Sequence, residues 1–228
     1  MNFPAERILF EDNHLLIVNK LPGELVQKDQ EGTAGLEDVL KQYLKVKYNK
    51  PGEVFLGVAH RLDRPTSGIV IFARTSKALV RLNEDFKNRT IKKIYWAVVK
   101  NKPLKTSNHL VHYLLRDSKS NLSKTFDKEI SHSQRAELNY ELKGSSDNYH
   151  LLEVELLTGR HHQIRAQLSK IGSPIKGDIK YGFDRTNKDG SIHLHARKVI
   201  FNHPVKKEEL TIIATPPNDP VWNFFAKL

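Results

Sequence analysis

The chain of 228 residues contains no cysteine. Disulfide bonds, cysteine-ligated zinc sites and iron–sulfur clusters are therefore excluded, and the composition suits a reducing compartment. No apolar run approaches the roughly 18 residues of a transmembrane helix, and the N-terminal sequence MNFPAERILFED lacks the apolar stretch of a secretory signal. We therefore expect a soluble, unprocessed, cytoplasmic protein that does not associate with a membrane.

The chain also lacks internal repeats and low-complexity linkers. Hydrophobic residues make up 39% of the sequence and charged residues 28%, values that are typical of a folded globular protein and too apolar for a disordered one. A chain of this length can bury one sizeable core or two small lobes. We predict a single domain over residues 1–228.

Acidic residues are too few to balance the basic ones, and the formal net charge is +11. Between Lys87 and Lys128, eleven lysines and arginines face two aspartates, and tyrosines, a tryptophan and histidines are interleaved with them. Such a segment fits phosphate contacts combined with base stacking, although a solvated basic face is the simpler alternative. The charge therefore points to a polyanionic partner, and nucleic acid is the commonest one.

The apolar patterns predict strands for most of the chain and three helices. Helical spacing appears at residues 35–48, 76–88 and 161–172, with Thr75 as the N-cap of the second helix. Strand patterns occupy residues 7–10, 14–20, 54–59, 69–73, 92–99, 109–115, 135–142, 149–157, 192–201 and 209–214. The mixed order predicts an α+β fold with a largely antiparallel mixed central sheet and flanking helices.

A charged stretch, HRLDRPTSG at residues 60–68, separates two apolar segments of strand length. Pro65, Ser67 and Gly68 indicate a turn, and Asp63 could simply cap it through hydrogen bonds to the backbone. Two arginines flank Asp63, however, and nearby cations keep a carboxylate ionised. Since an ionised carboxylate in a partly dry cleft can act as a nucleophile or a base, Asp63 is a candidate reacting group.

The segment LLTGRHHQIRAQL, residues 156–168, joins a turn to the start of a predicted helix. Arg160 to His162 would open this helix, where the first backbone amides can bind a phosphate. A helical wheel places Arg165 at the edge of the buried face. Arg165 could pair there with a carboxylate of a cleft wall or anchor the helix through a structural ion pair, and the two roles are compatible.

Several histidines raise the question of a metal site. His193 and His195 would project from the same face of a strand, as metal ligands can. No HExxH motif and no acidic partner at metal-ligand spacing accompanies them in the sequence. We therefore expect no metal and interpret these histidines as structural or RNA-facing.

A tyrosine stands in the apolar segment KKIYWAVV, residues 92–99. Such a residue is usually part of the core, with its hydroxyl satisfied at the rim. From the strand alone, Tyr95 is therefore a core residue, and a catalytic phenol is the alternative.

Together these segments resemble the RluA-type RNA pseudouridine synthases. HRLDRPTSG is similar to the family signature of HRLD, a variable pair and TSG, and EDNHLLIVNKLPGELV is similar to its first motif. KKIYWAVV, LTGRHHQIRAQL and the blocks GSPIKGDIKYG and LHARKVIFNHP resemble further family motifs in the same order, so the resemblance extends over residues 8–204. Leu21 and Gln27 depart from the residues that the family often has at these positions.

The resemblance implies the pseudouridine synthase fold with a central RNA-binding cleft, and isomerisation of specific uridines in structured rRNA or tRNA after base flipping, without a cofactor. Asp63 falls on the essential aspartate of the family, Tyr95 on its active-site tyrosine and Arg165 on the arginine that pairs with the aspartate. Arg61 falls on an arginine associated with filling the space left by the extruded base. Further RNA contacts are expected from His60, Lys92, Lys93, Arg160 and His162.

The resemblance also suggests the form of the family without an extra N-terminal RNA-binding module, acting as a monomer without an obligatory protein partner. Two other functions are compatible with the residues. One is a non-catalytic RNA-binding module on the same scaffold. The other is a hydrolytic N-glycosidase that uses Asp63 with a second carboxylate such as Asp178.

Overall fold

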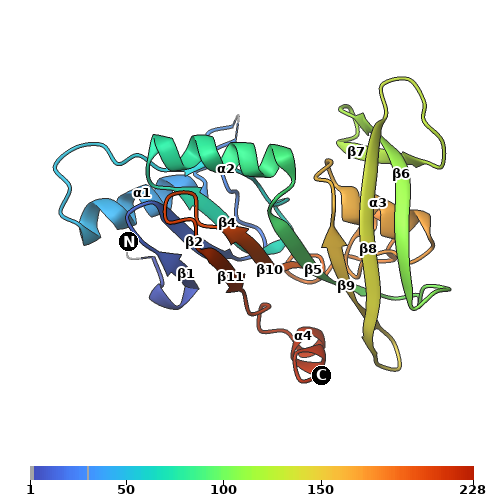
Figure 1. Ribbon diagram of the computed structural model, residues 1–228. Helices are drawn as coiled ribbons and strands as arrows, with labels where there is room; N and C mark the ends of the chain where they lie inside the picture. The colour runs from blue at the N-terminus through green and yellow to red at the C-terminus, as the bar shows by residue number, and fades with distance from the viewer. Residues whose placement is uncertain (1–2, 30) are drawn as a thin grey trace. The chain divides into compact units, whose positions relative to one another are not determined.

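The computed structural model describes residues 3–29 and 31–228, which form two compact units (Figure 1). The first unit comprises the chain up to Ile91 together with Arg197–Thr215, and the second comprises Lys92–Ala196 and Pro216–Leu228. Among the described residues, none of the helices has both the length and the apolar character needed to cross a bilayer.

The first unit contains sheet strands and two helices. Its elements in chain order are η1 (Ala5–Arg7), β1 (Ile8–Glu11), β2 (Leu15–Lys20), α1 (Leu36–Lys47), β3 (Gly57–Val58), β4 (Ser67–Ala73), α2 (Ser76–Asn88), the end of β10 (Leu194–Asn202) and β11 (Glu209–Ile213). The strands are ordered β1-β2-β4-β10, with β11 on β10 and β3 on β4. The pairs β1–β2, β2–β4, β3–β4 and β10–β11 are antiparallel.

The central strands β2 and β4 are buried along nearly their whole length, which explains why their sequences LLIVNK and SGIVIFA are apolar on both faces. In α1, apolar residues four positions apart form one stripe. That stripe packs against one face of the two strands, through Leu36, Leu40 and Leu44 of the helix and Leu16, Val18, Val70 and Phe72 of the sheet.

The helix α2 starts directly after β4. Thr75 Oγ1 accepts a hydrogen bond from Ala78 N at 3.2 Å and thereby caps the helix, as the sequence predicted. α2 contacts β3 and β4. Gly57 permits the close approach of the helix to β3, because a Cβ atom there would lie 2.7 Å from Leu79 Cδ2.

The second unit is built on a series of antiparallel strands. Its elements are β5 (Lys92–Val99), β6 (Ser107–Asp117), β7 (Leu122–Phe126), β8 (Gln134–Ser145), β9 (His150–Leu156), α3 (Gln163–Lys170), η2 (Ile179–Tyr181), the start of β10 and α4 (Pro220–Phe225). The strands are ordered β5-β9-β8-β6-β7, with antiparallel pairing throughout this series. α3 packs against β6 and β7, and α4 inserts Trp222 and Phe225 against Val98 and Leu151.

The predicted α+β class with largely antiparallel pairing is confirmed, and the ranges of α1, α2 and β5 match the sequence patterns within one residue at each end. The strand expected at 54–59 is wrong in extent, since only Gly57–Val58 pairs with β4. β7 and α4 were not predicted. The single domain over residues 1–228 and the central RNA-binding cleft stay predictions.

Candidate active site

Asp63 lies in the first unit, on an irregular segment between β3 and β4. Four residues separate it from the end of β3, so Asp63 does not lie at the end of a strand. A turn follows it, closed by a hydrogen bond from Thr66 N to Asp63 O at 3.0 Å. The side chain of Asp63 is half-buried. This segment is therefore positioned by contacts other than strand pairing.

The ammonium group of Lys20, at the end of β2, provides the first of these contacts. Lys20 is fully buried, and its Nζ donates to the carbonyl oxygens of Leu21, Arg64 and Thr66 at 3.0, 3.0 and 2.6 Å. These three acceptors match the three donors of an ammonium group. Burial lowers the pKa of Lys20 to about 8, while the nearby carboxylates of Glu24 and Asp63 oppose that shift. Lys20 thus ties both sides of the turn after Asp63 to β2.

Two further hydrogen bonds join the same turn to the Pro-Gly turn at residues 22–23. Gly23 N donates to Arg64 O at 2.8 Å, and Arg64 Nε donates to Gly23 O at 3.1 Å. Gly23 has φ +85°, a conformation that favours glycine. The variable position after the aspartate of the signature therefore has a structural role that its sequence context did not reveal.

His60 and Arg61 precede Asp63. His60 Nε2 accepts a hydrogen bond from Ile71 N at 2.9 Å, and its ring lies 4.7 Å from the ring of Phe86. His60 therefore fixes the segment to β4 and α2. Arg61 is exposed. RNA contacts of both residues stay predictions.

The second unit contributes β5, on which Tyr95 is paired with Val154 of β9 and is 9% exposed. Side chains alternate between the two faces of a strand, so Lys93 shares the face of Tyr95 and Lys92 projects to the opposite face. The structure therefore separates two lysines that the sequence placed together as RNA contacts.

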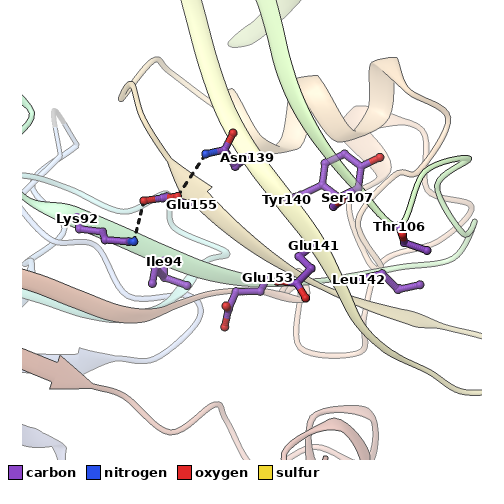
Figure 2. Close-up of a pocket in the computed structure, with 10 residues that line it drawn as sticks. All are labelled: Lys92, Ile94, Thr106, Ser107, Asn139, Tyr140, Glu141, Leu142, Glu153 and Glu155. Atoms are coloured by element: carbon purple, nitrogen blue, oxygen red, sulfur yellow. Dashed lines mark hydrogen bonds and ion pairs between the residues drawn. The ribbon is translucent and has the colours of Figure 1, made fainter.

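A hollow of about 540 Å³ lies on the Lys92 face of the sheet. Figure 2 shows the residues that line it. Lys92 Nζ lies 3.0 Å from Glu155 Oε1, and Asn139 Nδ2 donates to Glu155 Oε2 at 3.3 Å. Lys143 pairs with Glu141 at the edge of this region at 2.8 Å. Because the lysines here are matched by carboxylates, the hollow is a weak site for a polyanion.

Arg165 is held on α3 by a buried ion pair. Its Nε and Nη2 donate to Asp178 Oδ2 and Oδ1 at 2.6 and 2.9 Å, and the two residues are 4% and 2% exposed. The sequence predicted a carboxylate partner for Arg165, but Asp178 had been considered only as the second carboxylate of a hydrolase. Pairing of Arg165 with Asp63 stays a prediction, since Asp63 belongs to the other unit.

A tyrosine supports this ion pair. The guanidinium carbon of Arg165 lies 5.0 Å from the ring centre of Tyr181. The hydroxyl of Tyr181 accepts a hydrogen bond from Ser123 N at 2.8 Å and lies 3.0 Å from His162 Nδ1. Burial raises the pKa of Tyr181, so the phenol stays protonated at neutral pH.

The start of α3 differs from the expected phosphate site. The helix begins at Gln163, after His162 in a left-handed conformation with φ 51°. Arg160 N donates to Gln163 Oε1 at 3.0 Å, and Arg160 Nε donates to Arg135 O at 3.1 Å. His162 is buried. The amide of Arg160 is thus already satisfied, and RNA contacts of Arg160 and His162 stay predictions.

Sequence reasoning missed the supporting residues Lys20, Arg64 and Tyr181, and it missed the role of Asp178. A signal was available for Lys20 alone, as a lysine at the end of an apolar strand, one residue away from the Pro-Gly turn. Across residues 3–29 and 31–228, no three histidine, aspartate or glutamate side chains are grouped so that they could hold a metal ion.

The family model of the RNA pseudouridylate synthases matches residues 14–170. The chain therefore belongs to this family of isomerases, which convert uridine in RNA to pseudouridine. The match includes Lys20, Asp63, Tyr95 and Arg165.

Curated relatives with this activity in their names cover most of the chain. An uncharacterised RNA pseudouridine synthase of Bacillus subtilis (strain 168) is 32% identical over 224 residues, which are 93% of this chain and 69% of the relative. A ribosomal large subunit pseudouridine synthase C of Rickettsia bellii is 31% identical over 94% of this chain and 69% of the relative. A tRNA pseudouridine synthase C of Pectobacterium carotovorum is 30% identical over 91% of this chain and 58% of the relative.

Among solved structures, human RNA pseudouridylate synthase domain containing 4 is similar with a TM-score of 0.79. It is 26% identical, and the alignment covers 97% of this chain and 91% of that structure. Human RNA pseudouridylate synthase domain containing 1, which is 21% identical, shows the same fold with a TM-score of 0.73.

Proposed function

We propose that this chain isomerises specific uridines of structured rRNA or tRNA and that Asp63 is the reacting group. The observation that carries this proposal is that two sets of hydrogen bonds hold the Asp63 segment in place. One set is donated by Lys20, and the other is the reciprocal pair between Gly23 and Arg64. A half-buried carboxylate on an irregular segment gains precise placement from such contacts, and catalysis depends on placement. Relatives named for ribosomal and transfer RNA support both classes of substrate.

The reaction breaks the bond between N1 of uracil and C1′ of the ribose, rotates the base, and joins C5 to C1′. C5 then loses its proton and N1 gains one, so the overall change is an isomerisation without an oxidant or a reductant. Asp63 assists the first step in ionised form, either by attacking C1′ or by removing a sugar proton. Tyr95 is proposed to receive or relay the proton from C5, and Arg165 to stabilise the ionised aspartate.

The target nucleotide has to leave its stack before these groups can reach it, which costs a few kcal/mol. We propose that Arg61, which is exposed next to Asp63, fills the vacated space. Lys93, which shares the face of Tyr95, is proposed as a phosphate contact. A monomeric state and a cytoplasmic location are part of the same proposal.

Analysis of the product tests the proposed reaction against its two alternatives. Transcripts of rRNA and tRNA genes, labelled with tritium at C5 of uridine, are incubated with the protein and then digested to nucleosides. We expect tritium release in proportion to the pseudouridine formed. Binding without tritium release from any transcript would identify an RNA-binding module, and free uracil with abasic strand scission would identify an N-glycosidase. Asp178 is poorly suited to be the second carboxylate of such an N-glycosidase, because both of its oxygens accept hydrogen bonds from Arg165.

A further inference from the structure

We propose that Asp178 is a positioning residue, whose carboxylate holds the guanidinium of Arg165 in the orientation in which Arg165 serves the reaction. This inference rests on the proposed function and adds a residue to it. The pairing engages both oxygens of Asp178 and two nitrogens of Arg165. Because a guanidinium is planar, fixing Nε and Nη2 also fixes the direction of the Nη1 donors.

Asp178 is itself anchored to the strand that carries Tyr95. The residues before it are joined to β5 by a hydrogen bond from Lys176 N to Val98 O at 2.8 Å and by a bridge between Ile175 and Val99. Gly177, with φ +87°, leads the chain into Asp178, and a Cβ atom there would lie 2.7 Å from Ser191 O. Through this loop, the guanidinium of Arg165 on α3 is held in a fixed position relative to β5.

The peptide after Asp178 reinforces this arrangement. Asp178 O accepts hydrogen bonds from Tyr181 N and Phe183 N, both at 3.1 Å, and the ring of Tyr181 lies against the guanidinium of Arg165. The hydroxyl of Tyr181 is held by Ser123 N of β7. Asp178 and Tyr181 therefore contact the guanidinium from the same short loop, and both are tied to sheet strands.

A purely structural ion pair is the competing explanation. Burying two charges is expensive, and well-packed apolar residues of similar volume often stabilise a protein as much or more. The bidentate ion pair of the proposed catalytic Arg165 is therefore better explained by a need to orient its guanidinium than by a contribution to the stability of the fold. The two explanations differ in what they predict for a folded variant.

The test compares Asp178→Asn and Asp178→Glu with wild type and with Asp219→Asn as a matched control. Asp219 accepts a hydrogen bond from buried His193 at 2.9 Å, in the same unit but outside the proposed site. Single-turnover tritium release is measured with protein in excess over the labelled rRNA and tRNA transcripts, at a temperature where circular dichroism shows each variant to be folded. RNA affinity is measured on the same transcripts.

We expect Asp178→Asn and Asp178→Glu each to lower the single-turnover rate by about 10-fold or more, because misplacement by about an ångström is costly. The dissociation constants should change by less than about 3-fold, and Asp219→Asn should keep the wild-type rate. Folded Asp178 variants with wild-type rates would overturn the inference, as would losses that match the unfolded fraction. If Asp178→Asn does not fold, Asp178→Glu decides, since it keeps the charge. Absence of tritium release by wild type would instead contradict the proposed function itself.

Discussion

His193 illustrates how neighbouring side chains fix the protonation state of one residue. Lys176 Nζ donates to Asn187 Oδ1 at 2.7 Å, which turns Asn187 Nδ2 toward His193 Nδ1 at 3.0 Å. Nδ1 must therefore accept, and Nε2 carries the proton that is donated to Asp219 at 2.9 Å. The histidine that the sequence suggested as a possible metal ligand is thus a neutral structural residue.

This arrangement predicts a loss of stability at acidic pH. Burial lowers the pKa of His193 to about 4, against an ordinary value near 6.5. The unfolded state binds the extra proton between these values, so stability should fall as pH decreases from about 6.5 to 4, by at most about 3 kcal/mol from this residue. Urea unfolding across this range measures the effect.

The variant His193→Gln should show a weaker pH dependence than wild type over the same range. His132→Gln, at an exposed position, should behave as wild type and serves as the control. Equal slopes for wild type and His193→Gln would contradict the assignment of a neutral buried His193.

Lys20 allows a prediction about activity. Lys20→Met removes the three hydrogen bonds around the Asp63 turn and leaves buried carbonyl groups without their donor. We expect the single-turnover rate to fall by about 10- to 100-fold through misplacement of Asp63, with RNA affinity nearly unchanged. Lys41→Met, which removes a half-buried ion pair with Glu37 on α1, should keep the rate. A wild-type rate for folded Lys20→Met would show that the turn is held without Lys20.

At the scale of elements, local patterns predicted the structure where one face or both faces of a segment are apolar. α1 and α2 carry clear helical stripes and caps, and KKIYWAVV has the composition of a strand. β7, with the sequence LSKTF, is too short and polar to be recognised, and it exists because it pairs with β6. The start of α3 was placed too early because the left-handed conformation of His162 and the hydrogen bond from Gln163 to Glu137 O depend on tertiary structure.

The short helix α4 was also not predicted, although it closes the core of the second unit. Trp222 is 3% exposed and stacks on His193 with ring centres 5.1 Å apart. Trp222→Ala should lower the free energy of unfolding by about 3–5 kcal/mol. Phe224→Ala, at a residue that is 47% exposed, should cost about 0.5 kcal/mol. Equal losses in urea unfolding would show that α4 is not packed through Trp222.

At the scale of the whole molecule, the sequence nominated candidate reacting groups but not the residues that hold them in place. Asp63, Tyr95 and Arg165 stand in recognisable motifs, so each could be nominated from the sequence. Lys20 and Asp178 act through contacts with carbonyl oxygens and with a guanidinium, and no spacing rule reveals such contacts. The division of the chain into two units, with β10 shared between them, was likewise not readable from composition.

The excess of positive charge predicts salt-dependent RNA binding. Replacing the exposed Lys102, Lys105 and Lys119 with glutamine should weaken binding and reduce the slope of log affinity against log salt by about 2 to 3, since each phosphate contact contributes about 0.7 to 0.9. Lys92 and Lys100 are paired with Glu155 and Asp184, so replacing them should change the slope less. Filter binding at several salt concentrations measures the affinity and the slope for both sets of variants. An unchanged slope for the triple variant would show that these lysines are solvated and do not contact RNA.

The central claim is that Asp63 reacts, and the single-turnover rate of Asp63→Asn tests it most directly. Asp85→Asn, which alters another half-buried aspartate of the first unit, is the matched control. We predict that Asp63→Asn binds the labelled transcripts with wild-type affinity and melts at the wild-type temperature but releases no tritium, while Asp85→Asn keeps the wild-type rate. Tritium release by folded Asp63→Asn at a rate close to that of wild type would contradict the account.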